Sequence, residues 1–262
     1  MVNYDKILAD AISFAKEAGK VQLSLFRSKT LGITTKQNDF DIVTEADKAS
    51  ERIIKGGIQS KYPTHSILSE ESGLTQEGNE FQWVIDPLDG TTNFSAGLPL
   101  FNISIGIRHN DKTVAGVVYA PYLGELFSAV VGKGAYLNGN PVSVSHKSSL
   151  SQCVIATGFP YDKAVNPDNN LDNVERVLPE VRGLRRLGSA ALDISYVAAG
   201  FLDGFWELGL REWDVCAASL IAAEAGAVVQ SLRPDRNISL VVAPQEIFGQ
   251  LRALLAPPVQ ID

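Results

Sequence analysis

Apolar and polar positions follow two different rhythms along the chain. Residues 3–27 carry apolar side chains every three or four positions, which predicts a long amphipathic helix. A second helix is expected after Thr44, because acidic residues occupy its first turn and Pro63 ends the pattern. The segment between these helices, around residues 36–43, is expected to form a short strand pair or a loop.

The remaining pattern predicts two groups of strands. Short strands separated by turns such as HNDK and GKG fill residues 66–144, which indicates a mostly antiparallel meander. After about residue 150 strands and helices alternate, which favours a more parallel arrangement. We therefore expect a mixed α/β fold with helices layered on sheets. One compact unit would contain an N-terminal α+β lobe, residues 1–147, and a C-terminal α/β lobe, residues 148–262.

Composition narrows the classes of protein that fit this pattern. The chain has 262 residues and a net charge of −7, which argues against a broad nucleic-acid surface. A phosphate ligand remains compatible with that charge if divalent cations lie between it and the carboxylates of the protein. Cys153 and Cys216 lie in apolar runs and are expected to be buried. No stretch approaches the ~18 to 20 apolar residues of a membrane span, so we expect a cytoplasmic protein without a membrane partner.

The most informative segment is FQWVIDPLDGTTNF, residues 81–94. An apolar strand ends in Asp86 and Asp89, and Pro87 between them predicts a turn that brings both carboxylates and the Leu88 carbonyl to one side. Such oxygens are the ligands that Mg²⁺ requires. Gly90 would let a ligand approach the backbone, and a short helix from residue 91 would offer N–H groups to phosphate. The alternative is an ordinary turn whose aspartates cap backbone N–H groups.

Three other acidic segments are candidates for the same site, each with a simpler alternative. SILSEESG ends a strand in Glu70 and Glu71, which otherwise form a solvated acidic turn. Asp214 lies where a long apolar helix begins, and its simpler alternative role is the N-cap of that helix. The segment with Lys36 and Asp47 otherwise reads as a charged loop before a helix.

The whole chain resembles the inositol monophosphatase family. The motifs that carry the resemblance are SEES at 69–72, WVIDPLDGTTNF at 83–94, GSAALD at 188–193 and WELGLREWDVCAASLIAAEAG at 206–226. The resemblance implies a layered αβαβα sandwich of the inositol monophosphatase and fructose-1,6-bisphosphatase type. It also implies a homodimer, Mg²⁺ as cofactor and inhibition by lithium.

The resemblance further implies a role for individual residues. Glu70, Asp86, the Leu88 carbonyl, Asp89 and Asp214 would hold metal ions, and Lys36 would lie near a third metal or the phosphate. Glu70 and Thr91 would orient the attacking water, with Asp47 supporting Thr91. The substrate contacts would come from Gly90, Thr91, Gly188, Ser189, Ala190, Glu207 and Asp214.

These features predict a Mg²⁺-dependent phosphomonoesterase that hydrolyses a small polyol phosphate, inositol 1-phosphate first, with a metal-activated water. The same chemistry on fructose-1,6-bisphosphate, a nucleotide phosphate or histidinol phosphate stays open. An alternative of another class is a regulatory or interaction dimer in which the phosphatase site is incidental.

Overall fold

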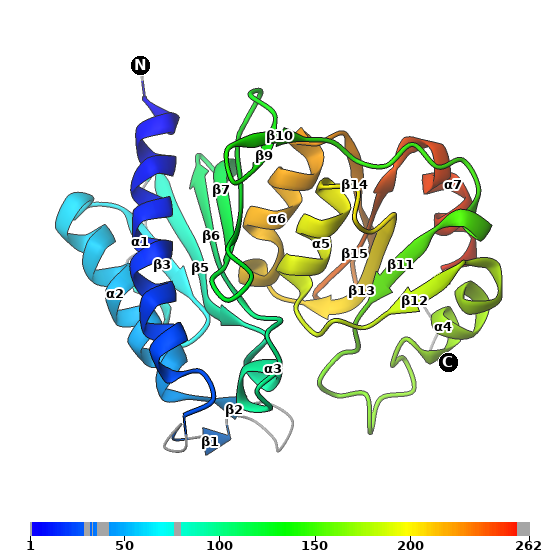
Figure 1. Ribbon diagram of the computed structural model, residues 1–262, viewed down its shortest axis with the longest axis horizontal. Coiled ribbons are helices and arrows are strands. Elements are labelled where there is room, and N and C mark those ends of the chain that lie inside the picture. The colour runs from blue at the N-terminus through cyan, green and yellow to red at the C-terminus, as the bar shows by residue number, and fades with distance from the viewer. Residues whose placement is uncertain (1, 29–31, 33, 36–41, 76–79, 256–262) are drawn as a thin grey trace.

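Five layers of secondary structure stack across the molecule (Figure 1). The computed structural model describes residues 2–28, 32, 34–35, 42–75 and 80–255. Helices α1 (Tyr4–Leu25) and α2 (Glu45–Lys61) cover the outer face of the first large sheet, and α5 (Ala190–Ala198) and α6 (Glu212–Glu224) lie between the two large sheets. Helices α4 (Leu171–Val177) and α7 (Gln245–Leu254) lie beyond the second sheet. The predicted αβαβα sandwich is therefore confirmed.

The first large sheet has eight strands in the order β10-β9-β8-β7-β6-β5-β3-β4. Its neighbours are antiparallel except for the parallel pair β3–β5, which confirms the predicted meander. Its strands are β3 (Ser66–Ser69), β4 (Gly73–Leu74), β5 (Phe81–Asp89), β6 (Asn102–His109), β7 (Lys112–Ala120), β8 (Glu125–Val130), β9 (Ala135–Leu137) and β10 (Asn140–Val142). The short helix α3 (Thr91–Ser95) follows β5.

A separate antiparallel pair consists of β1 (Thr34–Thr35) and β2 (Ile42–Val43). The rest of the predicted strand pair, residues 36–41, lies outside the described residues.

The second large sheet is only partly parallel. Its strand order is β12-β11-β13-β15-β14, and β11 pairs in parallel with both β12 and β13. Strands β14 and β15 pair antiparallel because the four residues between them can only join antiparallel neighbours. The expectation of a more parallel arrangement thus holds for three of the five strands: β11 (Val154–Thr157), β12 (Gly183–Arg185) and β13 (Gly204–Leu210), but not for β14 (Ala227–Arg233) and β15 (Ile238–Pro244).

The core follows the period-two alternation of the strands. On β7, Ala115 and Val117 pack against the layer of α1 and α2, whereas Val118 and Ala120 join the core of the middle layer. Both large sheets contribute side chains to that middle core. The division into lobes of residues 1–147 and 148–262 stays a prediction.

Helix α6 approaches the first sheet closely because two glycines lie beneath it. A Cβ on Gly106 would overlap the Cys216 side chain, and a Cβ on Gly116 would lie 3.0 Å from both the Cα and the carbonyl oxygen of Ala217. Cys153 and Cys216 are both buried and free, as predicted. Among the described helices, none combines the length and apolar character that crossing a membrane requires.

Gly116→Ala should lower the free energy of unfolding by about 1–3 kcal/mol, because the added methyl group meets backbone that cannot move without displacing α6. Urea denaturation followed by circular dichroism would measure the change. Gly56→Ala is the matched control, since Gly56 is exposed in α2 with open space around it. That control should stabilise the protein by about 0.4–1 kcal/mol. Equal effects at both positions would contradict the packing argument.

Candidate active site

An irregularity at the end of β5 brings two aspartates to one face of the first sheet. Asp86 lies opposite Ser104 and Asp89 opposite Asn102, so three steps along β5 match two along β6. Residues three apart on a regular strand point to opposite faces, and the one extra residue of this β-bulge cancels the difference. The turn predicted at Pro87 is therefore a bulge, where a residue without an N–H group is tolerated.

Asp89 connects the first sheet to the middle layer. Its Oδ2 accepts hydrogen bonds from the Ser189 hydroxyl (2.6 Å), the Ala191 N–H (2.9 Å) and the Asn102 amide (3.1 Å). Ser189 is the N-cap of α5, so the carboxylate lies at the partially positive end of that helix. The predicted GSA segment, Gly188 to Ala190, thus lies beside the aspartate bulge.

The residues after Asp89 make the sharp turn into α3. Gly90 has φ +92°, and a Cβ there would lie 2.8 Å from the Leu100 carbonyl oxygen, so only glycine fits. The hydroxyl oxygen of Thr91 lies 3.0 Å from the Leu88 carbonyl oxygen and 3.0 Å from Asp47 Oδ1. The predicted link between Thr91 and Asp47 is therefore present.

Asp47 reaches the site from the first turn of α2. Its Oδ2 accepts the Thr44 N–H (2.8 Å) and the Thr44 hydroxyl (2.5 Å), which closes a capping box. Burial raises the pKa of Asp47, and the charge of Glu70 raises it further, against the hydrogen bonds from Thr44 and Thr91. Asp47 thus completes the capping box of Thr44 and also contacts Thr91. It lies in the first turn of α2 and not in the charged loop that was the alternative for this segment. Lys36 lies outside the described residues.

Glu70 comes to Asp86 through the parallel pair β3–β5. The Glu70 N–H donates to the Ile85 carbonyl at 3.1 Å, one residue beyond the last paired residue of β3. The side chains of Glu70 and Asp86 also share a hydrogen bond. Pairing of two segments that are apart in the sequence therefore places these carboxyl groups together.

Asp214 and Glu207 enter from the second half of the chain. Helix α6 begins at Glu212, so Asp214 is its third residue and not the N-cap that the sequence suggested. Its Oδ2 accepts the Arg211 N–H at 2.7 Å, which still stabilises the start of the helix. Glu207 lies on β13, and its carboxylate lies against the backbone of Gly158, where a Cβ would overlap it.

Buried negative charge is the main electrostatic property of the site. Burial, followed by the charges of other carboxylates, raises the pKa of Asp86 and of Asp214 well above the usual range. Burial also raises the pKa of Asp89 despite its hydrogen bonds, and it raises the pKa of Glu207 to about 8. Glu70, Asp89 and Asp214 all act on Asp86, so the four predicted metal-binding side chains share one region.

Asp193 belongs to the same region and was missed as a site residue. It is 1% exposed, its Oδ1 has no hydrogen-bond partner among the described residues, and burial with the charges of Glu207 and Asp89 raises its pKa strongly. The signal was available in GSAALD, because residue 193 lies one helical turn after the N-cap Ser189 and so faces the same side.

The donor chemistry of this region suits a hard divalent cation. Its ligands would be carboxylate oxygens and one backbone carbonyl, and their mutual repulsion is what a cation would relieve. As the described side chains stand, no group of three or more acidic, histidine or cysteine residues is arranged as a metal site. The case for a cation therefore rests on charge and donor type, and the individual metal-binding roles stay predictions.

Known proteins with similar sequences and structures cover almost the whole chain. The model of the inositol monophosphatase family matches residues 3–257. Nus factor SuhB of Pasteurella multocida is 44% identical over 220 residues, which are 84% of this chain and 82% of that protein. Nus factor SuhB of Escherichia coli strain K12 is 41% identical over 231 residues, 88% of this chain and 86% of that protein.

Two solved structures give the same result. The extragenic suppressor protein suhB from Bartonella henselae has a TM-score of 0.90 at 35% identity and covers 97% of this chain and 100% of its own. The inositol monophosphatase from Anabaena has a TM-score of 0.85 at 37% identity and covers 98% of each chain. The match to the family model, with the fold and motifs described above, shows that this chain belongs to the inositol monophosphatase family and is a phosphatase of that superfamily.

Proposed function

We propose that the protein is a Mg²⁺-dependent phosphomonoesterase acting on a small polyol phosphate, with inositol 1-phosphate as the first substrate to test. One observation carries the proposal: in a buried region, the charges of Glu70, Asp89 and Asp214 raise the pKa of Asp86, and those of Asp89 and Glu70 raise the pKa of Asp214. A protein gains nothing in stability from such repulsion, so the arrangement points to a bound cation.

Mg²⁺ would be held by Glu70, Asp86, the Leu88 carbonyl, Asp89 and Asp214. When bound, it would supply positive charge for the phosphate and lower the pKa of a water molecule. The protein contributes the positions of the oxygen ligands, which the hydrogen bonds to Ser189, Ala191 and Arg211 support.

Thr91 and Asp47 are proposed to orient the attacking water. The single Thr91 hydroxyl proton goes to Asp47 Oδ1 or to the Leu88 carbonyl, and in either case a lone pair of the Thr91 oxygen remains to accept a hydrogen bond from that water. Glu70 would complete the orientation from the side of β3. Gly90 and Thr91 are proposed to offer N–H groups to the phosphate, because backbone N–H groups at the start of a helix have no partner within the helix.

The alcohol part of the substrate is proposed to contact Gly188, Ser189, Ala190, Glu207 and Asp214. A buried carboxylate such as Glu207 suits a hydroxyl group, since each hydroxyl can donate one hydrogen bond. This side of the site selects among polyol, sugar and nucleoside phosphates. Lithium inhibition, a homodimer and a cytoplasmic location remain expectations from the family resemblance.

A second candidate function has support from the relatives. Curated relatives carry the name Nus factor SuhB, which describes a factor and not a reaction. A regulatory or interaction role, with or without catalysis, is therefore the competing proposal, and the expected absence of a nucleic-acid surface is a proposal as well. An Asp214→Asn protein that lacks phosphatase activity but still replaces the parent protein in cells would favour the regulatory candidate.

Asp214→Asn should reduce kcat for inositol 1-phosphate by roughly 10²-fold or more, because the charge of a proposed metal ligand is removed while the Arg211 N–H can still be accepted. Phosphate release in saturating Mg²⁺ would measure this. In the metal-free protein the variant should unfold at the same or a higher temperature than the parent, since repulsion is relieved, and Mg²⁺ should no longer raise that temperature.

Asp172→Asn is the matched control, because Asp172 is an exposed acidic residue in the first turn of α4. It should leave activity and the Mg²⁺ response unchanged. An Asp214→Asn protein with full Mg²⁺-dependent activity would contradict the proposed metal site.

The metal-free protein should lose stability as the pH rises from about 5 to about 8. The folded-state pKa of Glu207 is raised from its usual 4.5 to about 8. The stability that the protonated side chain contributes is therefore fully present below the unfolded-state pKa, and it is lost as the pH rises through the folded-state pKa. Glu207→Gln should reduce this slope, as measured by urea denaturation in a chelator across that pH range. An unchanged slope would show that Glu207 titrates normally.

A further inference from the structure

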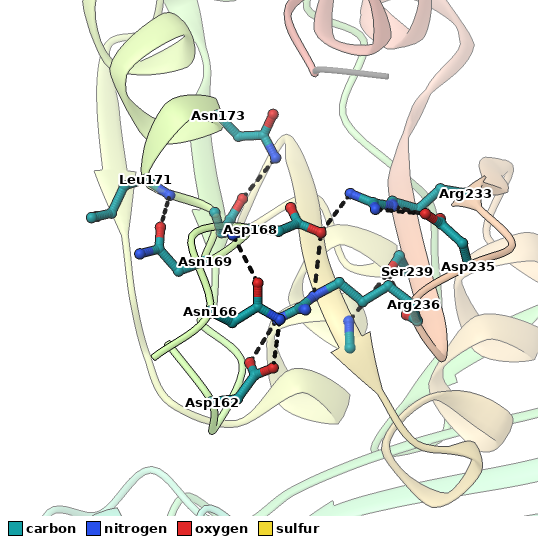
Figure 2. Close-up of polar contacts among 12 residues, drawn as sticks. Asp162, Asn166, Asp168, Asn169, Leu171, Asn173, Arg233, Asp235, Arg236 and Ser239 are labelled. Carbon is teal, nitrogen blue, oxygen red and sulfur yellow. Dashed lines mark hydrogen bonds and ion pairs between the residues drawn. The ribbon is translucent and has the colours of Figure 1, made fainter. Parts of the chain in front are cut away.

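A group of ion pairs joins two distant segments on the second sheet (Figure 2). Residues 158–170 form the loop between β11 and α4, and residues 234–237 form the turn between β14 and β15. Arg233 Nη1 lies 2.7 Å from Asp168 Oδ2, and Arg236 Nη2 lies 2.6 Å from Asp162 Oδ1. Both aspartates belong to the loop, and both arginines belong to the turn or its edge.

The two arginines are shielded and held in place. Their side chains are 7% and 13% exposed, and Arg233 also makes two parallel contacts to Asp235, at 2.7 and 2.8 Å. The two-pronged pair lies within the turn and fixes the Arg233 guanidinium, whereas Arg233 meets the loop through Asp168 and Arg236 meets it through Asp162, each by one short contact. The arginine ends of these contacts are shielded, so the pairs are less screened than fully exposed ion pairs. The pairs are therefore suited to holding the loop in one position.

The first residue of this loop lies on the carboxylate of Glu207. Gly158 follows the last residue of β11, and a Cβ at that position would overlap all three atoms of the Glu207 carboxylate. Asn170 closes the far end of the loop: its amide donates to the Gly158 carbonyl at 2.7 Å and to the Thr157 hydroxyl at 2.9 Å. The loop backbone thus forms a wall against Glu207.

The turn that carries the arginines also holds the strand of Glu207. Ser239 donates its hydroxyl to the Arg236 carbonyl at 2.8 Å and accepts the Gly209 N–H at 3.2 Å. Gly209 lies in the bulge of β13, two residues after Glu207, and a Cβ there would lie 3.3 Å from Pro160. The turn is therefore linked to Glu207 in two ways: its arginines hold the loop that packs against Glu207, and Ser239 next to it binds the strand that carries Glu207.

We propose that Arg233 and Arg236 are positioning residues that hold loop 158–170 against Glu207 and so determine selectivity for the hydroxyl groups of the leaving alcohol. The inference rests on the proposed function, in which Glu207 contacts that alcohol. None of these contacts reaches Asp86 or Asp89 directly, so the network acts on the alcohol side and leaves the aspartate bulge intact.

The test compares two substrates of different leaving groups. Inositol 1-phosphate presents hydroxyls to Glu207, whereas p-nitrophenyl phosphate presents none. Arg236→Ala and Gly158→Ala should each raise KM for inositol 1-phosphate roughly tenfold or more, because the hydroxyl contacts are misplaced. Both variants should keep the parent kcat and KM for p-nitrophenyl phosphate within about threefold. Arg236→Lys should raise KM for inositol 1-phosphate less than Arg236→Ala does, since lysine keeps the positive charge but lacks the planar guanidinium group.

Arg52→Ala is the matched control, because it breaks an arginine–glutamate pair of 2.9 Å on α2, away from Glu207. It should leave both substrates unchanged. Amide hydrogen exchange gives a readout that needs no substrate: Arg236→Ala should speed exchange in residues 158–170 and at Gly209, and Arg52→Ala should not.

If Arg236→Ala impaired hydrolysis of both substrates equally, or of neither, the positioning role would be overturned. Unchanged exchange in the loop would overturn it as well, even if the protein hydrolysed neither substrate. A parent protein that hydrolyses neither ester would instead count against the proposed function, so the two failures are distinguishable.

Discussion

The site depends on the hydrogen bonds that the Asp89 carboxylate accepts, because they join the first sheet to the middle layer of helices. One oxygen accepts the Ser189 hydroxyl, the Ala191 N–H and the Asn102 amide, and these donors come from α5 and from β6. The end of β5 is therefore held against the start of α5. Without this connection the aspartate bulge and the GSA segment would be separate features of two different layers.

Concentrating acidic groups in this region costs stability. Burial and mutual repulsion raise the pKa of Asp86 and Asp214, and some of the cost is offset where Asp89 and Asp214 lie at the starts of α5 and α6. The close approach of α6 to the first sheet, over Gly106 and Gly116, keeps Asp214 near the bulge. Packing thus holds together charges that would otherwise separate.

The two sides of the site come from different parts of the fold. Asp47, Glu70, Asp86, Asp89 and Thr91 belong to elements of the first half of the chain, whereas Glu207 and Asp193 come from the second sheet and from α5. Of these residues, Glu207 is the one against which loop 158–170 packs, at Gly158.

The sequence by itself determined the local features. Periodicity located the helices and strands, and the WVIDPLDGTTNF and WELGLREWDV strings marked the acidic candidates, because propensity, caps and motifs depend on neighbouring residues. Tertiary structure decided what depends on distant pairing. The parallel pair β3–β5 brought Glu70 to Asp86, the bulge turned Asp86 and Asp89 to one face, and β14–β15 proved antiparallel. The pairing of Asp162 with Arg236 joins residues 74 positions apart, and no local pattern encodes such a contact because it forms only when two separate strands meet in one sheet.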